Sequence, residues 1–206
     1  MIYSNPLHPP VDPANYSRYS SLEGALDLPP SQPTSTFLSP TRRRLPQPSY
    51  IPVSKWKAAM GRLNQLHNPI TFDYIGYSKQ GVPMQELMAR GTTALASMIQ
   101  GANDAVFAHT GLIRIAFRII WPGYEHVEWA RTIELTRGKT PITRAQLGST
   151  ISLSFARFVE KTRLEPSTPN EWNLTSSGIR FEHLVLVALV NVFDNVWLAD
   201  VAVDLR

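Results

Sequence analysis

Alternating apolar side chains constrain the fold of this chain more than any other feature. Between residues 112 and 136, apolar residues recur at every second position, and the stretch 122–126 divides the segment in two. Alternation over about ten residues, twice, is typical of β-strands that bury one face. Keeping the two apolar faces together sets the register, which pairs Phe117 with Arg131 and Arg114 with Glu134. We therefore predict an antiparallel hairpin over residues 112–136.

The C-terminal residues predict a second hairpin. Residues 184–193 and 197–205 are rich in Val, Leu and Ala, and Asp194-Asn195 between them makes a two-residue turn that pairs the strands in register. The first of these strands is apolar on both faces, as is usual for a strand inside a sheet or under a helix. The second is expected at a sheet edge, where outward Asp200 and Asp204 would discourage unspecific pairing.

Helices are predicted around and between these hairpins. Thr143 and Gln146 form a capping-box pattern, and the apolar stripe that follows predicts a helix to about Lys161. Two earlier helices are predicted over residues 55–66 and, after Pro83, over residues 84–100. Two hairpins that bracket a helix indicate an α+β fold with a mostly antiparallel four-stranded sheet and helices packed on it.

The proline distribution divides the chain. Eleven of the 17 prolines lie in the first 52 residues, which are also rich in Ser, Thr and Asn. Proline fixes φ and removes a backbone donor, so we predict a disordered arm over residues 1–50 and a single α+β domain over residues 51–206. A mobile proline-rich arm is typical of a tether or docking segment.

The most distinctive patch of the arm is Ser39-Pro40-Thr41-Arg42-Arg43-Arg44. One interpretation is a short basic address or phosphate-contacting arm, beside a proline-directed phosphorylation site. The other is a solvated cluster of charges in a linker. Short arginine motifs occur often by chance, so the sequence alone favours the second interpretation.

Composition narrows the classes of protein further. The chain contains no cysteine, which excludes a disulfide framework, a thiolate zinc site and a cysteine nucleophile. No apolar run reaches the roughly 20 residues of a membrane span, and the N-terminus lacks the pattern of a signal peptide. We therefore expect an intracellular protein of the cytoplasm or nucleus. The net charge of +4 is spread along the chain, which gives nucleic-acid binding little support.

No pattern for catalysis or for a cofactor stands out. His126 and Glu128 lie two residues apart on one predicted strand, which could make half of a metal site, but no spacing motif supplies further ligands. The chain has no Gly-x-Ser-x-Gly elbow, dinucleotide fingerprint or P-loop. We therefore expect no enzyme activity, no metal and no cofactor.

A resemblance is carried by four stretches in the C-terminal half: Trp121-Pro122-Gly123-Tyr124, residues 141–147 with Ile142-Thr143-Arg144, residues 155–158 and residues 184–189. Over about residues 110–206, the chain resembles a group of small uncharacterised proteins of basidiomycete fungi. The resemblance implies a fungal, intracellular setting and supports the domain boundary. It implies no activity and no catalytic residue.

These observations favour a non-catalytic protein-interaction or assembly module, with a protein partner or self-association. The alternative is a nucleic-acid-binding protein that uses a basic arm and a sheet face, because exposed aromatic rings beside arginines can stack on single-stranded bases. Arg131 is a charge on an otherwise apolar strand face, as at an interface or at the edge of a core. The candidate interaction residues are Arg42, Arg43, Arg44, Arg114, Arg118, Tyr124, Arg131 and Trp197.

Overall fold

The computed structural model of the chain describes residues 37–47, 50, 67–138, 140–168 and 171–205. All of these residues belong to one compact unit. Most of the predicted arm and the predicted helix over residues 55–66 lie outside the described residues.

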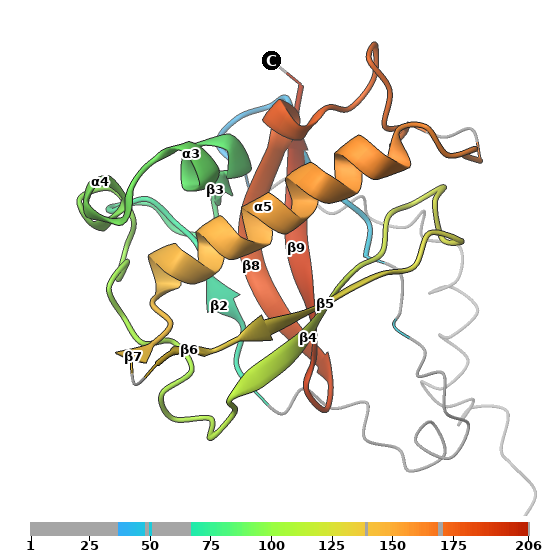
Figure 1. Cartoon of the computed structure of the whole chain (residues 1–206). Coiled ribbons are helices and arrows are strands. Elements are labelled where there is room, and N and C mark those ends of the chain that lie inside the picture. Colours follow the sequence, from blue (N-terminus) through green and yellow to red (C-terminus); the bar gives the residue numbers. More distant parts are fainter. Residues whose placement is uncertain (1–36, 48–49, 51–66, 139, 169–170, 206) are drawn as a thin grey trace, which may run out of the picture. The chain divides into compact units, whose positions relative to one another are not determined.

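A mixed seven-stranded sheet forms the centre of this unit (Figure 1). Its main path is β2-β8-β9-β4-β5, with β1 beside β9 and β3 beside β8. The strands are β1 Arg42–Arg44, β2 Ile70–Thr71, β3 Val82–Pro83, β4 Arg114–Ile119, β5 Trp129–Glu134, β8 Leu184–Phe193 and β9 Val196–Asp204. A separate two-stranded sheet pairs β6 Thr136–Arg137 with β7 Thr140–Pro141.

The α+β class is confirmed, but the predicted four-stranded, mostly antiparallel sheet is wrong. The two hairpins meet through β4 and β9, which run parallel and place Phe117 opposite Trp197. Three short strands extend the sheet. β2 lies at the start of residues 70–77, which the sequence predicts as a short strand or an extended connection. The sequence did not predict β1 and β3, and β1 lies in the segment expected to contain no strand. Strands of two or three residues carry no periodicity of their own, because their pairing depends on the surrounding sheet.

Both predicted hairpins are present. β4 and β5 pair in the predicted register, with Phe117 opposite Arg131 and Arg114 opposite Glu134. β8 and β9 meet at the predicted turn, but the pairing shifts by one residue at two places, between Leu186 and Ala188 and between Asn191 and Phe193. The uninterrupted register expected there is therefore wrong. β9 also lies inside the sheet, flanked by β8 on one side and by β4 and β1 on the other.

The helix α5, Arg144–Thr162, lies across one face of the sheet (Figure 1). Its N-terminus carries the predicted capping box between Thr143 and Gln146. The single helix expected over residues 84–100 is instead two short ones, α3 Met84–Ala89 and α4 Thr92–Ala96, because Gly91 adopts an extended conformation between them. A 3-10 turn, η2 Phe181–His183, leads into β8.

The main core lies between α5, α3 and the sheet. The predicted apolar stripe of α5 is buried in it: Leu147, Ile151, Phe155, Phe158 and Val159. Opposite this stripe, Trp121 and Phe117 are fully buried and pack near the rings of Phe158 and Phe155. On the other face of the sheet, Phe37 packs against Val185, Val187 and Ala202.

Among the described residues, no helix has the length and apolar character required to cross a bilayer.

Candidate functional site

The loop from Phe72 to Gly81 builds one wall of the most distinctive pocket. The buried carboxylate of Asp73 accepts hydrogen bonds from the backbone N–H groups of Gln80 (2.7 Å) and Gly81 (3.0 Å), which closes the loop at its base. The backbone N–H of Tyr77 donates to the carbonyl of Tyr74 at 3.0 Å, which makes a turn at its tip. These bonds fix the backbone that carries the two tyrosines.

Gly81 is required where the loop meets β8. Its φ of +75° lies in the left-handed region, and a Cβ atom there would stand 2.7 Å from Cγ1 of Val185 and 2.8 Å from the carbonyl oxygen of Leu186. Any side chain would push the loop away from the strand, since real Cβ contacts are longer than this. The glycine therefore sets how closely the tyrosine loop lies against the sheet.

Strand β1 and the residues before it build the opposite wall. The Arg42 guanidinium donates two hydrogen bonds to Oδ2 of Asp204, at 3.0 and 3.1 Å, and a third to the carbonyl of Gln80 at 2.6 Å. The backbone N–H of Leu38 donates to the side-chain oxygen of Gln80 at 2.8 Å. Arg42 and Gln80 thus join β1, β9 and the tyrosine loop.

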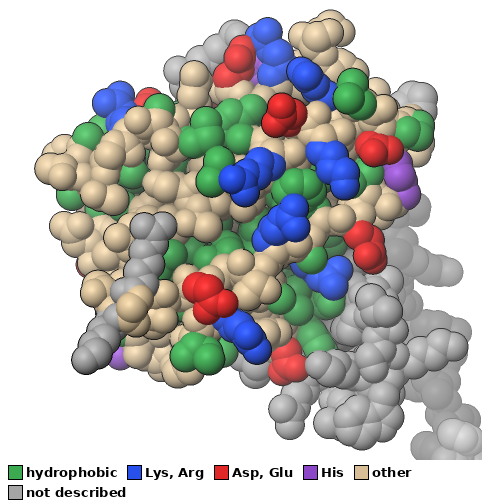
Figure 2. All heavy atoms as spheres, in the orientation of Figure 1, with side chains coloured by type: hydrophobic (Ala, Val, Ile, Leu, Met, Phe, Trp, Pro, Cys, Tyr) green, Lys and Arg blue, Asp and Glu red, His purple; other side chains and the backbone are tan. Residues whose placement is uncertain are grey.

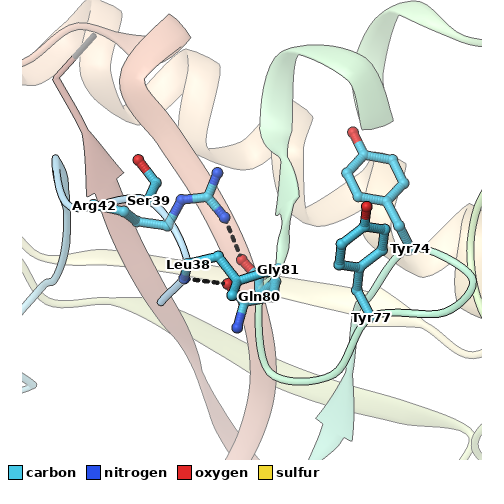
Figure 3. Close-up of a pocket in the computed structure, with 7 residues that line it drawn as sticks. All are labelled: Leu38, Ser39, Arg42, Tyr74, Tyr77, Gln80 and Gly81. Atoms are coloured by element: carbon cyan, nitrogen blue, oxygen red, sulfur yellow. Dashed lines mark hydrogen bonds between the residues drawn. The ribbon is translucent and has the colours of Figure 1, made fainter. Parts of the chain in front are cut away.

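The pocket between these walls has a volume of about 300 Å³. Figure 3 shows Tyr74 and Tyr77 side by side on one side of it, with Leu38, Gln80 and Arg42 on the other. Leu38 is 74% exposed and Tyr77 is 55% exposed, so the rim presents apolar surface to solvent. The Tyr77 hydroxyl has no hydrogen-bond partner among the described residues.

Tyr74 is a weak acid in this setting. Burial raises the pKa of Tyr74 to about 12, and the Glu86 carboxylate, which accepts a hydrogen bond from the phenol, adds to the rise. Arg90 lies 3.1 Å from the same carboxylate and opposes the effect. The phenol therefore stays protonated and acts as a hydrogen-bond donor throughout the neutral range.

A pH titration tests this assignment. The folded pKa of Tyr74 exceeds its ordinary value of 10.0, so the group stabilises the fold below about pH 10 and loses that contribution as the pH rises towards 12. We expect Glu86→Gln to lower the Tyr74 pKa only part of the way towards 10.0, because burial is the larger cause. Phenolate absorbance, compared with a Tyr74→Phe variant, isolates this titration. If the Tyr74→Phe variant forms as much phenolate near pH 12 as the unchanged protein, the assignment is wrong.

The three candidate arginines of the predicted arm all form ion pairs in the fold. Arg42 pairs with Asp204 at 3.0 Å, Arg43 with Glu171 at 2.6 Å and Arg44 with Asp200 at 3.2 Å. The guanidinium of Arg43 also lies over the ring of Trp172, 5.3 Å from its centre. These arginines therefore dock β1 on the rest of the domain. Of the three, only Arg42 lines the pocket, together with Ser39.

The candidate aromatic residues are in the core. Tyr124 is 2% exposed, and its hydroxyl accepts a hydrogen bond from the backbone N–H of Leu174. Trp197 is 1% exposed and packs between the rings of His67 and Phe107. Neither side chain offers a surface on which a base could stack.

The remaining candidate arginines lie on the β4–β5 hairpin and do not converge on the pocket. Arg114 is exposed, and Arg118 is half-buried with its guanidinium over the ring of Tyr50. Arg131 lies at the rim of the core, where its guanidinium stacks 4.7 Å from the centre of the Trp129 ring. The charge on an apolar strand face is thus accommodated by a neighbouring aromatic ring.

Basic side chains do gather on the face that carries α5 (Figure 2). The helix α5 itself carries exposed Arg157 and Lys161. Figure 2 shows acidic side chains scattered among them, so the charge on this face is mixed. Nucleic-acid domains concentrate positive charge in a stripe, which this face does not do.

A second hollow, of about 570 Å³, contains a well-anchored arginine. Arg144 donates hydrogen bonds to the carbonyls of Thr71 and Gly101 and lies 3.4 Å from the Asp104 carboxylate. These contacts engage all three nitrogens of the guanidinium and hold its segments together. Across the part of the chain that the structure describes, no three His, Asp or Glu side chains come together as metal ligands would.

Comparison with family models, with curated proteins and with solved structures found no match for this chain.

Proposed function

We propose that this protein is a non-catalytic protein-interaction module that binds an extended, proline-rich peptide segment in the pocket between Tyr74, Tyr77 and Leu38. The observation that carries the proposal is the exposed apolar rim of this pocket. Scattered exposed apolar side chains are ordinary, but Leu38 and Tyr77 stand on opposite sides of one hollow whose inner wall is a half-buried tyrosine. Such a hollow offers anchoring contacts to a partner side chain.

The shape and polarity of the pocket suit a proline-rich ligand. A polyproline II segment has no internal hydrogen bonds, so its carbonyls accept hydrogen bonds from the protein while its rings pack on aromatic side chains. Tyr77 supplies both an exposed ring and a hydroxyl with no described partner. At about 300 Å³ the pocket is at the small end of ligand sites, which fits a few side chains of a peptide.

The charge of the pocket favours an uncharged ligand. Arg42 is the one charged residue among those that line it, and this guanidinium already pairs with Asp204 at 3.0 Å. A phosphate or carboxylate ligand would have to compete with that buried carboxylate. A neutral segment would leave the pair intact.

The nucleic-acid alternative depended on stacking by Tyr124 or Trp197. Both rings are buried, and the basic face over α5 is mixed in charge. No observation on the described residues favours this alternative over peptide binding.

Calorimetric titration of the full chain with a synthetic oligoproline peptide tests the proposal. We expect Tyr77→Ala to weaken binding at least about tenfold, because an aromatic anchor in a binding pocket contributes 2 kcal/mol or more. Ile113→Ala is the matched control: Ile113 is an apolar residue 67% exposed on another surface, and its loss is expected to leave binding unchanged. The proposal is contradicted if the unchanged chain, Tyr77→Ala and Ile113→Ala bind the peptide equally, or if none of them binds it.

A further inference from the structure

We propose that Ser39 is the substrate of a proline-directed protein kinase and that its phosphorylation separates β1 from β9. Since β1 and the residues before it build one wall of the pocket that carries Tyr74 and Tyr77, the tyrosine pocket, the modification would weaken ligand binding there. This inference rests on the proposed function and names its regulation. The observation that supports it is the position of Ser39 beside the buried Arg42–Asp204 pair.

Ser39 lies in a segment that a kinase can reach. Proline-directed kinases modify a serine or threonine that immediately precedes proline, and Pro40 follows Ser39. Pro40 and the residues Leu38 and Thr41 are exposed, and Ser39 is partly exposed. A single backbone hydrogen bond, from the N–H of Arg42 to the carbonyl of Ser39 at 3.2 Å, closes the turn between them. Opening this turn would present residues 38–41 to a kinase in extended form.

The modification takes its phosphoryl group from ATP. The Ser39 hydroxyl oxygen forms a bond to the γ-phosphorus, the bond from this phosphorus to the β–γ bridging oxygen breaks, and ADP leaves with that electron pair. The hydroxyl proton passes to a carboxylate base of the kinase. The product carries a charge of about −1.5 to −2 at neutral pH and three strong acceptor oxygens.

The new phosphate would stand beside a buried carboxylate. The Ser39 hydroxyl lies 3.5 Å from Oδ1 of Asp204 and 2.9 Å from the hydroxyl of Thr41. The Thr41 hydroxyl in turn donates to the same Oδ1 at 2.6 Å. Asp204 is 8% exposed, so salt and water screen the repulsion between the two anions poorly. Repulsion at this distance disfavours the state in which β1 is docked on β9.

The phosphate would also compete with Asp204 for Arg42. The Arg42 guanidinium donates to Oδ2 of Asp204 at 3.0 and 3.1 Å and to the carbonyl of Gln80 at 2.6 Å. Phosphate oxygens accept paired hydrogen bonds from a guanidinium as carboxylate oxygens do. A guanidinium drawn towards Ser39 would leave Asp204 unpaired and would release the carbonyl of Gln80. Both links that β1 makes through Arg42, to β9 and to the tyrosine loop, would be weakened together.

Phosphorylation at Ser39 also changes the pocket itself. Ser39 is one of the residues that line it, so the phosphate would add negative charge to a site whose polarity suits an uncharged ligand. The chain has two other sequences in which threonine precedes proline, at Thr140 and Thr168. Neither of these threonines lines the tyrosine pocket. A phosphate on either one would leave the Arg42–Asp204 pair without a competing anion.

The test treats the full-length chain with a purified proline-directed kinase and ATP. Mass spectrometry is expected to locate phosphate on Ser39 and to find this site lost in Ser39→Ala. Phosphorylation is expected to raise hydrogen exchange at residues 42–45 at least about tenfold, because a buried ion pair is disrupted. Calorimetric titration with oligoproline is expected to show binding weakened at least about tenfold.

Three variants control for other effects of charge. Kinase-treated Ser39→Ala reports what phosphate on other residues does, and it is expected to match the untreated chain in exchange and binding. Ser39→Asp is expected to change both in the same direction as the phosphate but by less, because it adds a single charge. Thr140→Asp is the matched control, since it adds that charge at an exposed residue before another proline, and it is expected to change neither.

The outcomes separate this inference from the proposed function. The inference is wrong if the kinase leaves Ser39 unmodified, or if exchange at residues 42–45 is unchanged or lower in the phosphorylated chain. If the phosphorylated and unmodified chains bind oligoproline equally, the regulation is wrong while the proposed function stands. If neither binds the peptide, the proposed function is wrong, and hydrogen exchange alone decides whether the phosphate separates β1 from β9.

Discussion

Trp121→Ala is expected to lower the free energy of unfolding by about 3–5 kcal/mol, the usual cost of removing a large aromatic side chain from a core. The Trp121 side chain has no exposed surface, and its ring packs near that of Phe158 on α5. Its indole N–H also donates to the carbonyl of Trp172 at 2.7 Å, which ties the connection before β8 to the end of β4. The variant would lose packing and this hydrogen bond together.

Urea unfolding of two further variants separates these contributions. Trp121→Phe keeps much of the ring volume and removes the N–H. Its free energy of unfolding should therefore lie between that of the unchanged protein and that of the alanine variant. Leu164→Ala is the control, since Leu164 is 83% exposed and should change stability by less than about 0.5 kcal/mol. A Trp121→Ala variant as stable as the Leu164 control would contradict the placement of Trp121 in the core.

Asp204→Ala is expected to cost about 3–5 kcal/mol, because it leaves a buried guanidinium without its carboxylate. The side chains of Arg42 and Asp204 are only 10% and 8% exposed. Asp204 also accepts a hydrogen bond from the Thr41 hydroxyl at 2.6 Å, so its loss weakens two links between β1 and β9. Because Arg42 holds Gln80, the same variant should weaken oligoproline binding.

The double variant Arg42→Met/Asp204→Leu shows whether the cost comes from the unpaired charge. Replacing a buried ion pair by apolar residues is often neutral, so the double variant should be more stable than Asp204→Ala alone. Urea unfolding measures both, and hydrogen exchange at residues 42–45 reports the docking of β1. If Asp204→Ala unfolds like the unchanged protein and exchange there does not increase, β1 does not depend on this pair.

The long elements of the fold were predictable because each carries its own periodicity. The alternation in residues 112–136 was sufficient for the register of β4 and β5, and the Thr143–Gln146 capping box located the start of α5. The arrangement of the hairpins was not predictable. The parallel contact of β4 with β9 joins two segments that are far apart in the sequence, and no local pattern records it.

Strand β1 shows why the rest of the sheet was missed. Its residues pair with β9 across 162 positions of sequence, from Arg42 to Asp204. A signal was present, since Arg42 and Arg44 on β1 match Asp204 and Asp200 on β9, which we had instead expected at an open edge. Complementary charges in two distant segments are common by chance, so the pairing becomes visible only in the structure.

The candidate site was also missed for a physical reason. The sequence predicted a strand or extended connection over residues 70–77, which is correct only at Ile70–Thr71. The pocket depends on three features that lie apart in the sequence. Asp73 closes the tyrosine loop, Gly81 allows this loop to lie close to β8, and Leu38, which precedes β1, lines the other side. Of the residues proposed from sequence, only Arg42 lines the pocket.

An NMR titration that locates the bound peptide tests directly whether the tyrosine pocket binds a proline-rich segment. The full-length protein would be titrated with oligoproline while amide and aromatic signals are followed. We expect shifts centred on Tyr74, Tyr77, Gln80 and Leu38. Shifts confined to another surface, such as the edge strand β5, or no shifts at all, would contradict this prediction.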